Sequence, residues 1–218
     1  MTNLRILSLG DNGLVGTVPY LLFERLLNLK RINLGRNQLY GVLPPQVGSL
    51  KNLTSLDLAT NEFSGSLPSE LFTMTQLQQL NLARNRFQGS LPTTVGILTR
   101  MTMLDLSSNQ FTGTLPSELG QLSQLSDLRA SELNLTGTLP TEIGSIPTLE
   151  RLILSYCDFS GSVPTEWARL TSLTKVSLQG NRLVGNVSFF CASDSLDLLL
   201  QVDLQDTTCD CCSCCTNS

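Results

Sequence analysis

The sequence predicts an α/β solenoid of eight stacked coils, each about 24 residues long, and three observations support this prediction. A leucine-like residue opens each unit. The first interval between these residues is 25 residues, and the six that follow are 24. Each unit then reads L-x-x-L-x-L-x-x-N-x-(L/F)-x-G-x-(L/V)-P, as in "LTSLDLATNEFSGSLP" from Leu53 to Pro68. The opening residues are Leu4, Leu29, Leu53, Leu77, Met101, Leu125, Leu149 and Leu173.

The L-x-L part of each unit predicts a β-strand with one face toward the core. In the third unit Leu56 and Leu58 alternate with Ser55, Asp57 and Ala59. Because side chains in a strand point alternately to opposite faces, the leucines are expected inside and the other three outside. Stacking the units places these strands side by side in one parallel sheet.

An asparagine follows most of these expected strands, where the chain leaves the sheet and turns. Its amide group can donate to and accept from backbone groups that the turn leaves unpaired. Leu133 and Cys157 stand at this position in units six and seven; a thiol can act there as a weak donor, whereas leucine offers nothing. The asparagines are Asn12, Asn37, Asn61, Asn85, Asn109 and Asn181.

The second half of each unit predicts a turn, a short outer strand and a helical segment. Phenylalanines two residues after the asparagine position, at Phe63, Phe87, Phe111 and Phe159, are expected to stack on one another. A glycine then suits a tight bend. We expect the outer strand at x-(L/V)-P and a 3₁₀ turn in segments such as "SELF" and "TEIG". The glycines are Gly16, Gly41, Gly65, Gly89, Gly113, Gly137, Gly161 and Gly185.

The pattern N-x-(L/F)-x-G-x-(L/V)-P followed by x-x-(L/I/V)-G resembles the plant-type leucine-rich repeat, and in particular the ectodomains of receptor-like proteins. The resemblance covers residues 1–196. It implies a right-handed superhelix whose parallel sheet lines the concave face, with short outer strands and 3₁₀ turns on the convex side. It also implies a protein, peptide or glycan ligand on that concave face. No kinase segment accompanies the repeats in this chain.

The two ends of the repeat array are expected to differ. Met1 holds the position that Leu50 and Leu98 occupy before their own units, which predicts a chain that begins inside a longer solenoid and lacks an N-terminal cap and signal peptide. At the other end, Leu199, Val202 and Leu204 repeat the L-x-x-L-x-L spacing. We therefore expect a partial ninth strand and a cysteine-rich cap in residues 197–218, after eight repeats in residues 1–196.

Six of the seven cysteines lie near the C-terminus, and an even number favours disulfides, with fifteen possible pairings. A four-thiolate zinc site is the alternative, which the absence of two separate C-x₂-C pairs weakens. The segments "FFC" and "CDCCSCC" also resemble the C-terminal ends of secreted or surface leucine-rich repeat proteins of diatoms and related algae. The six predicted cap residues are Cys191, Cys209, Cys211, Cys212, Cys214 and Cys215.

Composition excludes several classes of function. The net charge is −4, which argues against binding nucleic acid through a basic face. The sequence contains no stretch of eighteen uncharged apolar residues, so it predicts no membrane span. The chain has no histidine, no paired carboxylates that stand out from the repeat and no glycine-rich phosphate loop, so we expect neither catalysis nor a cofactor. A lyase or hydrolase on a parallel solenoid is thereby disfavoured.

The concave face is the predicted ligand surface. Its middle is small and polar, whereas the rows near Arg129, Arg151 and Tyr156 carry larger side chains of the kinds that anchor interfaces. A sheet face that is merely solvated would also be polar, and a spacer or adhesive surface protein is the alternative function. The predicted ligand-binding residues are Arg84, Asp105, Asp127, Arg129, Glu132, Arg151, Tyr156 and Lys175.

Three N-x-(S/T) sequons begin at Asn52, Asn134 and Asn186, all at outward positions of the repeat. Together with a disulfide cap they predict a glycoprotein that is extracellular or at the cell surface. A chain of this composition would contain about three sequons by chance, so a cytoplasmic location stays open as the alternative.

Overall fold

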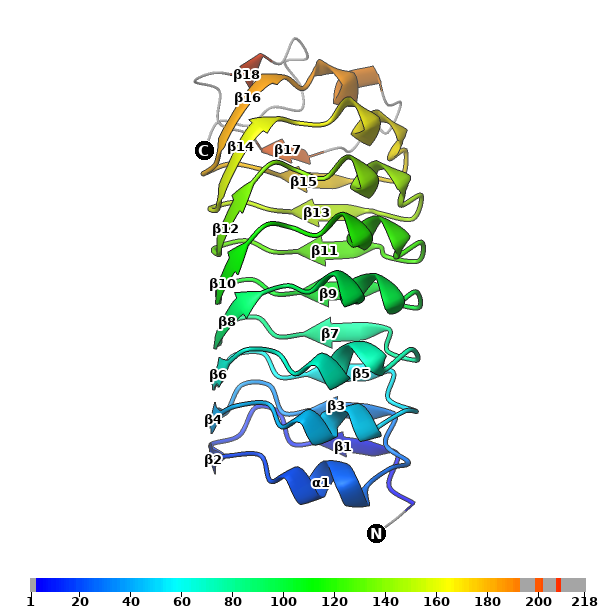
Figure 1. Cartoon of the computed structure of the whole chain (residues 1–218), viewed down its shortest axis with the longest axis vertical. Coiled ribbons are helices and arrows are strands. Elements are labelled where there is room, and N and C mark those ends of the chain that lie inside the picture. Colours follow the sequence, from blue (N-terminus) through cyan, green and yellow to red (C-terminus); the bar gives the residue numbers. More distant parts are fainter. Residues whose placement is uncertain (1–2, 193–198, 202–206, 209–218) are drawn as a thin grey trace.

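The computed structural model describes residues 3–192, 199–201 and 207–208, and these residues form a single stack of coils (Figure 1). One parallel sheet of nine strands runs the length of the stack, each strand pairing with its neighbours in the preceding and following coils. This first sheet contains β1 (Ile6–Ser8), β3 (Arg31–Asn33), β5 (Ser55–Asp57), β7 (Gln79–Asn81), β9 (Met103–Asp105), β11 (Asp127–Arg129), β13 (Arg151–Ile153), β15 (Lys175–Ser177) and β17 (Leu199–Gln201).

A second parallel sheet, also of nine strands, forms a neighbouring side of the stack. Its strands from β2 to β16 end at or just after the repeat glycine, so they lie earlier than the expected x-(L/V)-P position, which instead leads into the helical segment. The strands are β2 (Val15–Gly16), β4 (Gln38–Gly41), β6 (Glu62–Gly65), β8 (Arg86–Ser90), β10 (Gln110–Gly113), β12 (Asn134–Gly137), β14 (Asp158–Ser162), β16 (Arg182–Asn186) and β18 (Thr207–Thr208).

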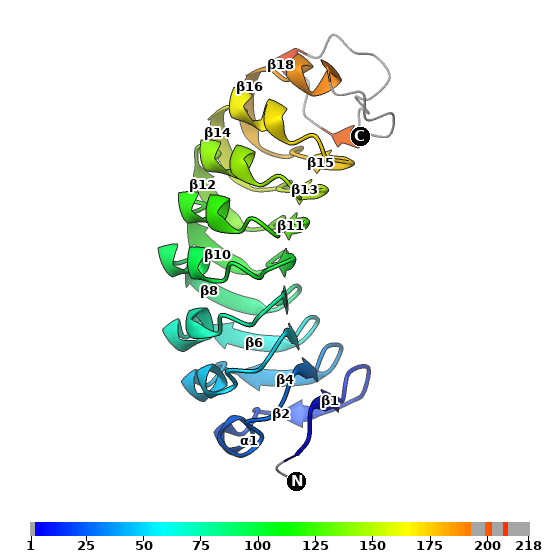
Figure 2. The ribbon, with the colours of Figure 1, turned by 90° about the vertical axis from the view of Figure 1, so that its right-hand side faces the viewer.

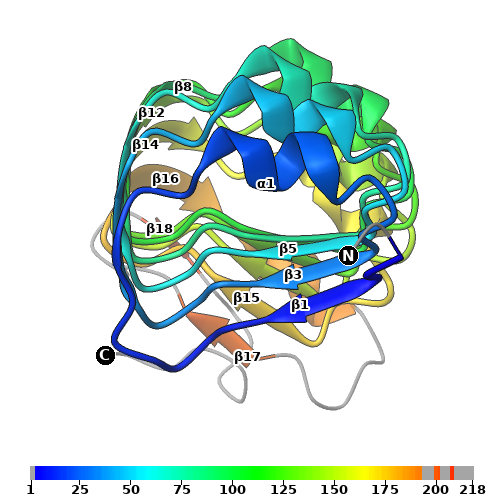
Figure 3. The same ribbon diagram turned by 90° about the horizontal axis from the view of Figure 1, so that it is seen from below.

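Short helices occupy the side opposite the first sheet, as the view along the stack shows (Figure 3). The first is an α-helix and the others are 3₁₀ helices. A proline stands immediately before each of η1 to η6 with φ between −61° and −78°, the value to which its ring holds the backbone. The helices are α1 (Tyr20–Arg25), η1 (Pro45–Ser49), η2 (Ser69–Thr73), η3 (Thr93–Ile97), η4 (Ser117–Gln121), η5 (Thr141–Ser145), η6 (Thr165–Arg169) and η7 (Ser188–Ala192).

The stack is curved, and the first sheet lies on its concave side (Figure 2). Neighbouring strands in a sheet are about 4.8 Å apart, whereas packed helices need a wider separation. A coil with a strand on one side and a helical segment on the other is therefore wedge-shaped. Repeating such a coil bends the stack with its strands inside, which makes the outward side chains of the first sheet a hollowed surface.

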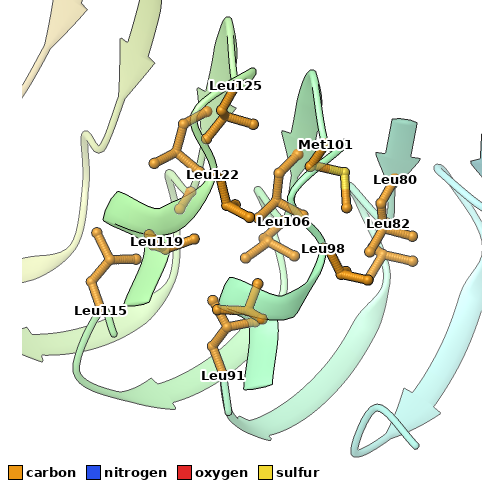
Figure 4. Packing of buried hydrophobic residues seen from close by; sticks show 14 of the residues in the cluster. Leu80, Leu82, Leu91, Leu98, Met101, Leu106, Leu115, Leu119, Leu122 and Leu125 are labelled. Carbon is orange, nitrogen blue, oxygen red and sulfur yellow. The ribbon is translucent and has the colours of Figure 1, made fainter. Parts of the chain in front are cut away.

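A continuous row of leucines fills the space between the two sheets and the helices, with the same positions of each coil in contact from one coil to the next (Figure 4). The predicted aromatic stack is present over three coils. The rings of Phe63 and Phe87 have centroids 5.9 Å apart, and those of Phe87 and Phe111 are 6.4 Å apart. Leu135 takes the phenylalanine position in the next coil and interrupts the stack of rings, and Phe159 is buried at this position one coil further on. Trp167 stands at the repeat position of Leu119 and Ile143; like them it is fully buried, and its indole N–H donates to the Pro140 carbonyl.

The asparagine positions form a hydrogen-bonded ladder, as the sequence predicts. The amide nitrogen of Asn85 donates to the Leu58 carbonyl at 2.9 Å, the Leu82 carbonyl at 3.1 Å and the Ala83 carbonyl at 3.2 Å. Its Oδ1 accepts from the Phe63 backbone N–H at 3.0 Å. Each such side chain therefore joins its own turn to the turn of the preceding coil.

Two neighbouring coils depart from this ladder. Leu133 is buried at the asparagine position and provides no hydrogen-bonding group to the turn. Cys157 is buried in the next coil, where its Sγ lies 3.3 Å from the Ala130 carbonyl, in keeping with a weak S–H donor. Burial raises the pKa of the Cys157 thiol.

The helical side of the stack depends on a residue without a side chain. In η5, a Cβ on Gly144 would lie 2.5 Å from the Glu166 carbonyl oxygen of η6, so only glycine permits this approach. Gly48, Gly96 and Gly120 have equivalent close neighbours. Phe72 occupies this position in η2 and is buried, and η2 packs less closely on η3 than the other helices between α1 and η6 pack on one another.

The C-terminal expectations are addressed only in part. Strand β17 extends the first sheet beyond β15, which agrees with a ninth strand. Met1, Val202 and Leu204, and the predicted cap residues Cys209, Cys211, Cys212, Cys214 and Cys215, lie outside the described residues. Cys191 is in η7, but its side chain is not among those described. None of the helices in the described part of the chain has the length and apolar character of a membrane span.

Candidate functional site on the concave face

The concave face is made of the outward side chains of the first sheet and of the loop that follows each of its strands. Strand pairing is in register, so residues 24 apart lie beside one another in columns. One column contains Arg31, Ser55, Gln79, Met103, Asp127, Arg151 and Lys175. The next contains Asn33, Asp57, Asn81, Asp105, Arg129, Ile153 and Ser177.

Four short polar side chains in the second column are held by the backbone. Oδ1 of Asp57 accepts from the Ala59 backbone N–H at 3.0 Å, and Oδ1 of Asp105 accepts from the Ser107 N–H at 3.0 Å. Oδ1 of Asn33 and Oδ1 of Asn81 likewise accept from the backbone N–H two residues ahead. These side chains shape the turn after each strand, and Asp57 and Asp105 also line the hollowed side of the sheet.

The loop after each first-sheet strand from β1 to β13 contains a non-glycine residue in the left-handed region, with φ of 55° to 59°. Its N–H bonds to the next coil, as when Arg36 donates to the Ala59 carbonyl at 2.7 Å. The conformation costs a non-glycine residue about 1–2 kcal/mol, and these bonds offset that cost. The residues are Asp11, Arg36, Thr60, Arg84, Ser108, Glu132 and Tyr156. Three of the predicted ligand-binding residues therefore project from one edge of the concave face.

Tyr156 is 54% exposed at this edge and its ring lies against Gly180 of the following coil. Any side chain at Gly180 would collide with the ring, and Gly180 itself has φ +71°. The two features together keep the tyrosine ring laid over the backbone of coil eight rather than standing free in solvent.

A buried acid organises the two arginines that the sequence singled out. Asp127 is 4% exposed, and its Oδ1 accepts from Arg129 Nε at 2.9 Å. Its Oδ2 accepts from Arg129 Nη2 at 2.8 Å and from Arg151 Nε at 2.9 Å. The hydrogen bond to Asp127 raises the pKa of Arg129. Asp127 is thus a support beneath the surface rather than a group that meets a ligand, and the sequence analysis placed it on the surface.

Two hollows follow one another along the concave face. The first, of about 750 Å³, lies over coils one to five and is lined by charged residues of both signs, among them Asp57 and Arg84. The second, of about 510 Å³, lies over coils four to eight. It brings together six of the eight predicted residues, namely Arg84, Asp105, Arg129, Glu132, Arg151 and Lys175. It also includes Ser131, Ser155 and Gln179, whose polar side chains were not singled out from the sequence.

The other candidate sites are the three glycosylation sequons and a metal site. Asn52, Asn134 and Asn186 are exposed, as glycosylation would need, and the attachment of glycans stays a prediction. Among the residues that the structure describes, no three His, Cys, Asp or Glu side chains come together in a way that would hold a metal ion.

Comparisons with known proteins point to one family. The family described as "Leucine-rich repeat region" matches residues 1–128, and a second, "Leucine Rich Repeat", matches residues 148–170. A search of curated proteins found no match. Similar solved structures include the leucine-rich-repeat ectodomain of the plant membrane receptor kinase GASSHO1/SCHENGEN3 from Arabidopsis thaliana, in complex with CASPARIAN STRIP INTEGRITY FACTOR 2. This match has 33% identity and a TM-score of 0.88, and it covers 94% of this chain and 24% of that one.

Two further structures show the range of the fold. The plant peptide hormone receptor RGFR1 in complex with RGF2 matches with 33% identity and a TM-score of 0.87, over 92% of this chain and 33% of that one. A plant ice-binding protein matches with 27% identity and a TM-score of 0.68, over 85% of this chain and 67% of that one. The chain spans about a quarter to a third of the length of the two receptors. On the family match over more than half of its length, the chain belongs to the leucine-rich repeat proteins, of the plant type found in receptor ectodomains.

Proposed function

We propose that the chain is a non-catalytic recognition module that binds an extended peptide or a segment of a protein along its concave face. The observation that carries this proposal is the second hollow, where six predicted residues from five successive coils line one depression. Guanidinium groups, a lysine amine and hydroxyls supply donors there, and Tyr156 supplies an aromatic ring at the edge. Two of the similar structures are receptors in complex with ligands, which supports a peptide over the glycan that the resemblance also implied.

The length of the face fits a peptide of moderate size. The eight strands from β1 to β15 span about 34 Å at the usual strand spacing, and an extended chain covers about 3.3 Å per residue. A ligand that ran the whole length would therefore need about ten residues. Such a ligand could contact both hollows at once.

The experiment compares a concave variant with a matched control. Arg151→Glu combined with Tyr156→Ala changes a charge and removes a ring on the concave face. Arg169→Glu combined with Tyr40→Ala makes the same two changes at exposed positions of η6 and β4, away from that face. Both proteins are immobilised and challenged with extracellular extract from the native source, and captured proteins are identified by mass spectrometry. Partners lost only from the concave variant support the proposal, whereas equal capture by both variants contradicts it.

A spacer or adhesive surface protein is the second candidate. The plant ice-binding protein shares this fold, so the fold alone does not decide the ligand, and it is the assembled hollow that favours recognition. A spacer would give capture that no concave substitution changes, and the experiment above therefore separates the two functions.

We also propose that the chain acts outside the cell. The two receptor structures support this location, as do the exposed sequons. A shift in mobility after glycosidase treatment of the native protein, together with resistance of its C-terminal cysteines to alkylation until a reductant is added, would agree with it. A native protein without glycans and with freely alkylated C-terminal cysteines would contradict it.

A further inference from the structure

We propose that Arg129, Arg151 and Lys175 form a carboxylate site, which takes an acidic side chain from an interior position of a peptide ligand. This inference rests on the proposed function and names the chemistry of its ligand. The site lies on β11, β13 and β15, in the second hollow.

The charges at this place do not balance within the described residues. Among the described residues, Asp127 is the only acid within ion-pair distance of either arginine, while Asp105 on the neighbouring strand β9 acts on Arg129 at longer range. Lys175 follows Arg151 in the same column and forms no ion pair among the described residues. The nearby acid Glu132 is engaged as the acceptor of the Ser108 hydroxyl at 2.6 Å. The lining of the second hollow has three arginines and a lysine against Asp105 and Glu132, a net charge of +2, which the buried Asp127 beneath them reduces to +1.

Asp127 also fixes how the remaining donors are directed. It binds Arg129 through Nε and Nη2, and Arg151 through Nε alone. Both terminal nitrogens of Arg151 and the second terminal nitrogen of Arg129 are left without a hydrogen bond among the described residues. Guanidinium groups held on adjacent strands with terminal N–H groups available match the two oxygens of a carboxylate. Because the side chains are already immobilised by Asp127, binding would need little further ordering.

The position of the site indicates a side chain rather than a chain end. The second hollow continues past Arg151 to Ser177 and Gln179 in coil eight, and the first hollow continues in the other direction from Arg84. A peptide lying in these hollows would pass over the arginines with residues on both sides. The carboxylate that reaches them would then belong to a glutamate or aspartate within the peptide.

The test uses a phage-displayed library of random twelve-residue peptides, whose C-termini are fused to the coat protein and so offer no terminal carboxylate. Peptides are selected on the whole chain and the strongest binder is synthesised with both ends blocked. We expect the selected peptides to be enriched in Glu or Asp. Replacing that acid by its amide should weaken binding about ten- to hundredfold, the range for losing charge-assisted hydrogen bonds.

Variants of the protein locate the effect. Arg151→Gln should weaken binding of the acidic peptide about ten- to hundredfold and should change binding of its amide analogue little. Arg36→Gln, a matched change in the first hollow, should change the affinity of both peptides little. Arg151→Lys keeps the charge but loses the planar fork, so we expect it to weaken the acidic peptide nearly as much as Arg151→Gln. Arg151→Lys with wild-type affinity would overturn the role of Asp127 in holding the guanidinium. Circular dichroism and thermal unfolding confirm that each variant is folded.

The remaining outcomes separate the two levels of the proposal. Peptides whose binding depends on Tyr156 but not on an acid would overturn the carboxylate site and leave the recognition function standing. Selection of no concave-face peptide at all, from a folded protein, would overturn both. Binding of an oligouronide through Arg151, in the absence of any selected peptide, would overturn the peptide class and assign the site to a glycan.

Discussion

The asparagine ladder gives a stability prediction that can be worked from single bonds. Replacing Asn85 by leucine keeps a side chain of similar size in a buried place but removes the two N–H donors of Nδ2, which three carbonyls share, and one accepted bond. At about 1 kcal/mol for each of these three bonds, the loss is about 3 kcal/mol. The extra apolar surface of leucine offsets about 1 kcal/mol of this, because part of the site is already apolar. We therefore expect the free energy of unfolding to fall by about 2 kcal/mol.

The assay is urea unfolding followed by circular dichroism, with the same substitution at an exposed asparagine as the control. Asn134→Leu lies on β12, where the side chain is exposed, and it should change the free energy of unfolding by less than about 0.5 kcal/mol. In a domain of this size, the Asn85 variant should also melt about 4–8 °C lower. Equal stabilities for the two variants would refute the view that the ladder contributes to stability.

The chain contains the reverse case at Leu133. An asparagine there would occupy the ladder position that Asn85 and Asn109 occupy in their coils. By the same offsets along the chain, it would donate to the Leu106 and Ala130 carbonyls and accept from the Phe111 backbone N–H. We expect Leu133→Asn to raise the free energy of unfolding by about 1 kcal/mol, less than a full ladder position because the buried leucine side chain is lost. A destabilisation by Leu133→Asn would mean that the sixth coil has relaxed around its leucine and no longer has room for the ladder geometry.

Two further predictions concern the helical side and the buried thiol. Gly144→Ala should lower stability by about 1–3 kcal/mol, because its Cβ would lie 2.5 Å from the Glu166 carbonyl oxygen, while Ser145→Ala beside it should have little effect; thermal unfolding of both variants checks this. Cys157 should resist iodoacetamide at neutral pH in the folded protein and react fully in denaturant, and rapid alkylation without denaturant would contradict its burial. Because burial raises the pKa of this thiol above its ordinary value of 9.0, the folded protein holds the proton more tightly than the unfolded chain. Its contribution to stability is therefore complete at neutral pH and declines as the pH rises past that value, and Cys157→Ser should remove this part of the alkaline decline in urea titrations.

The features that repeat every 24 residues were predictable, because each depends on a local pattern that the next coil copies. The first sheet, the ladder and the leucine core follow from period-2 alternation and from the chemistry of asparagine. The outer strands were misplaced because pairing in the second sheet does not follow the period. Ser64 pairs with Arg86 and Thr112 with Asn134, residues only 22 apart, so aligned repeats do not reveal which residues are opposite one another.

Sequence patterns identify the residues of the candidate site but not how deeply each side chain is buried. Period-2 alternation correctly places Asp127 on the outward face of β11. Its burial depends on two long arginine side chains that fold over a shorter acid, which is a property of side-chain length and of the neighbouring strand. The spacing of 24 between Asp127 and Arg151 is the signal that could have indicated the pair in advance.

Phe72 stands where most neighbouring coils have glycine, and it weakens the contact between two coils of an otherwise regular array. In a linear array, stability depends on how strongly each coil is coupled to the next. Coils three and four are joined by both sheets, but the bulky ring on η2 reduces the helix contacts that reinforce most of the other boundaries. Among the boundaries from α1 to η6, this is therefore the one where neighbouring coils are coupled most weakly. We expect hydrogen exchange to report two folding blocks, one before β7 and one after it, so that a protein built as one continuous stack would open as two pieces.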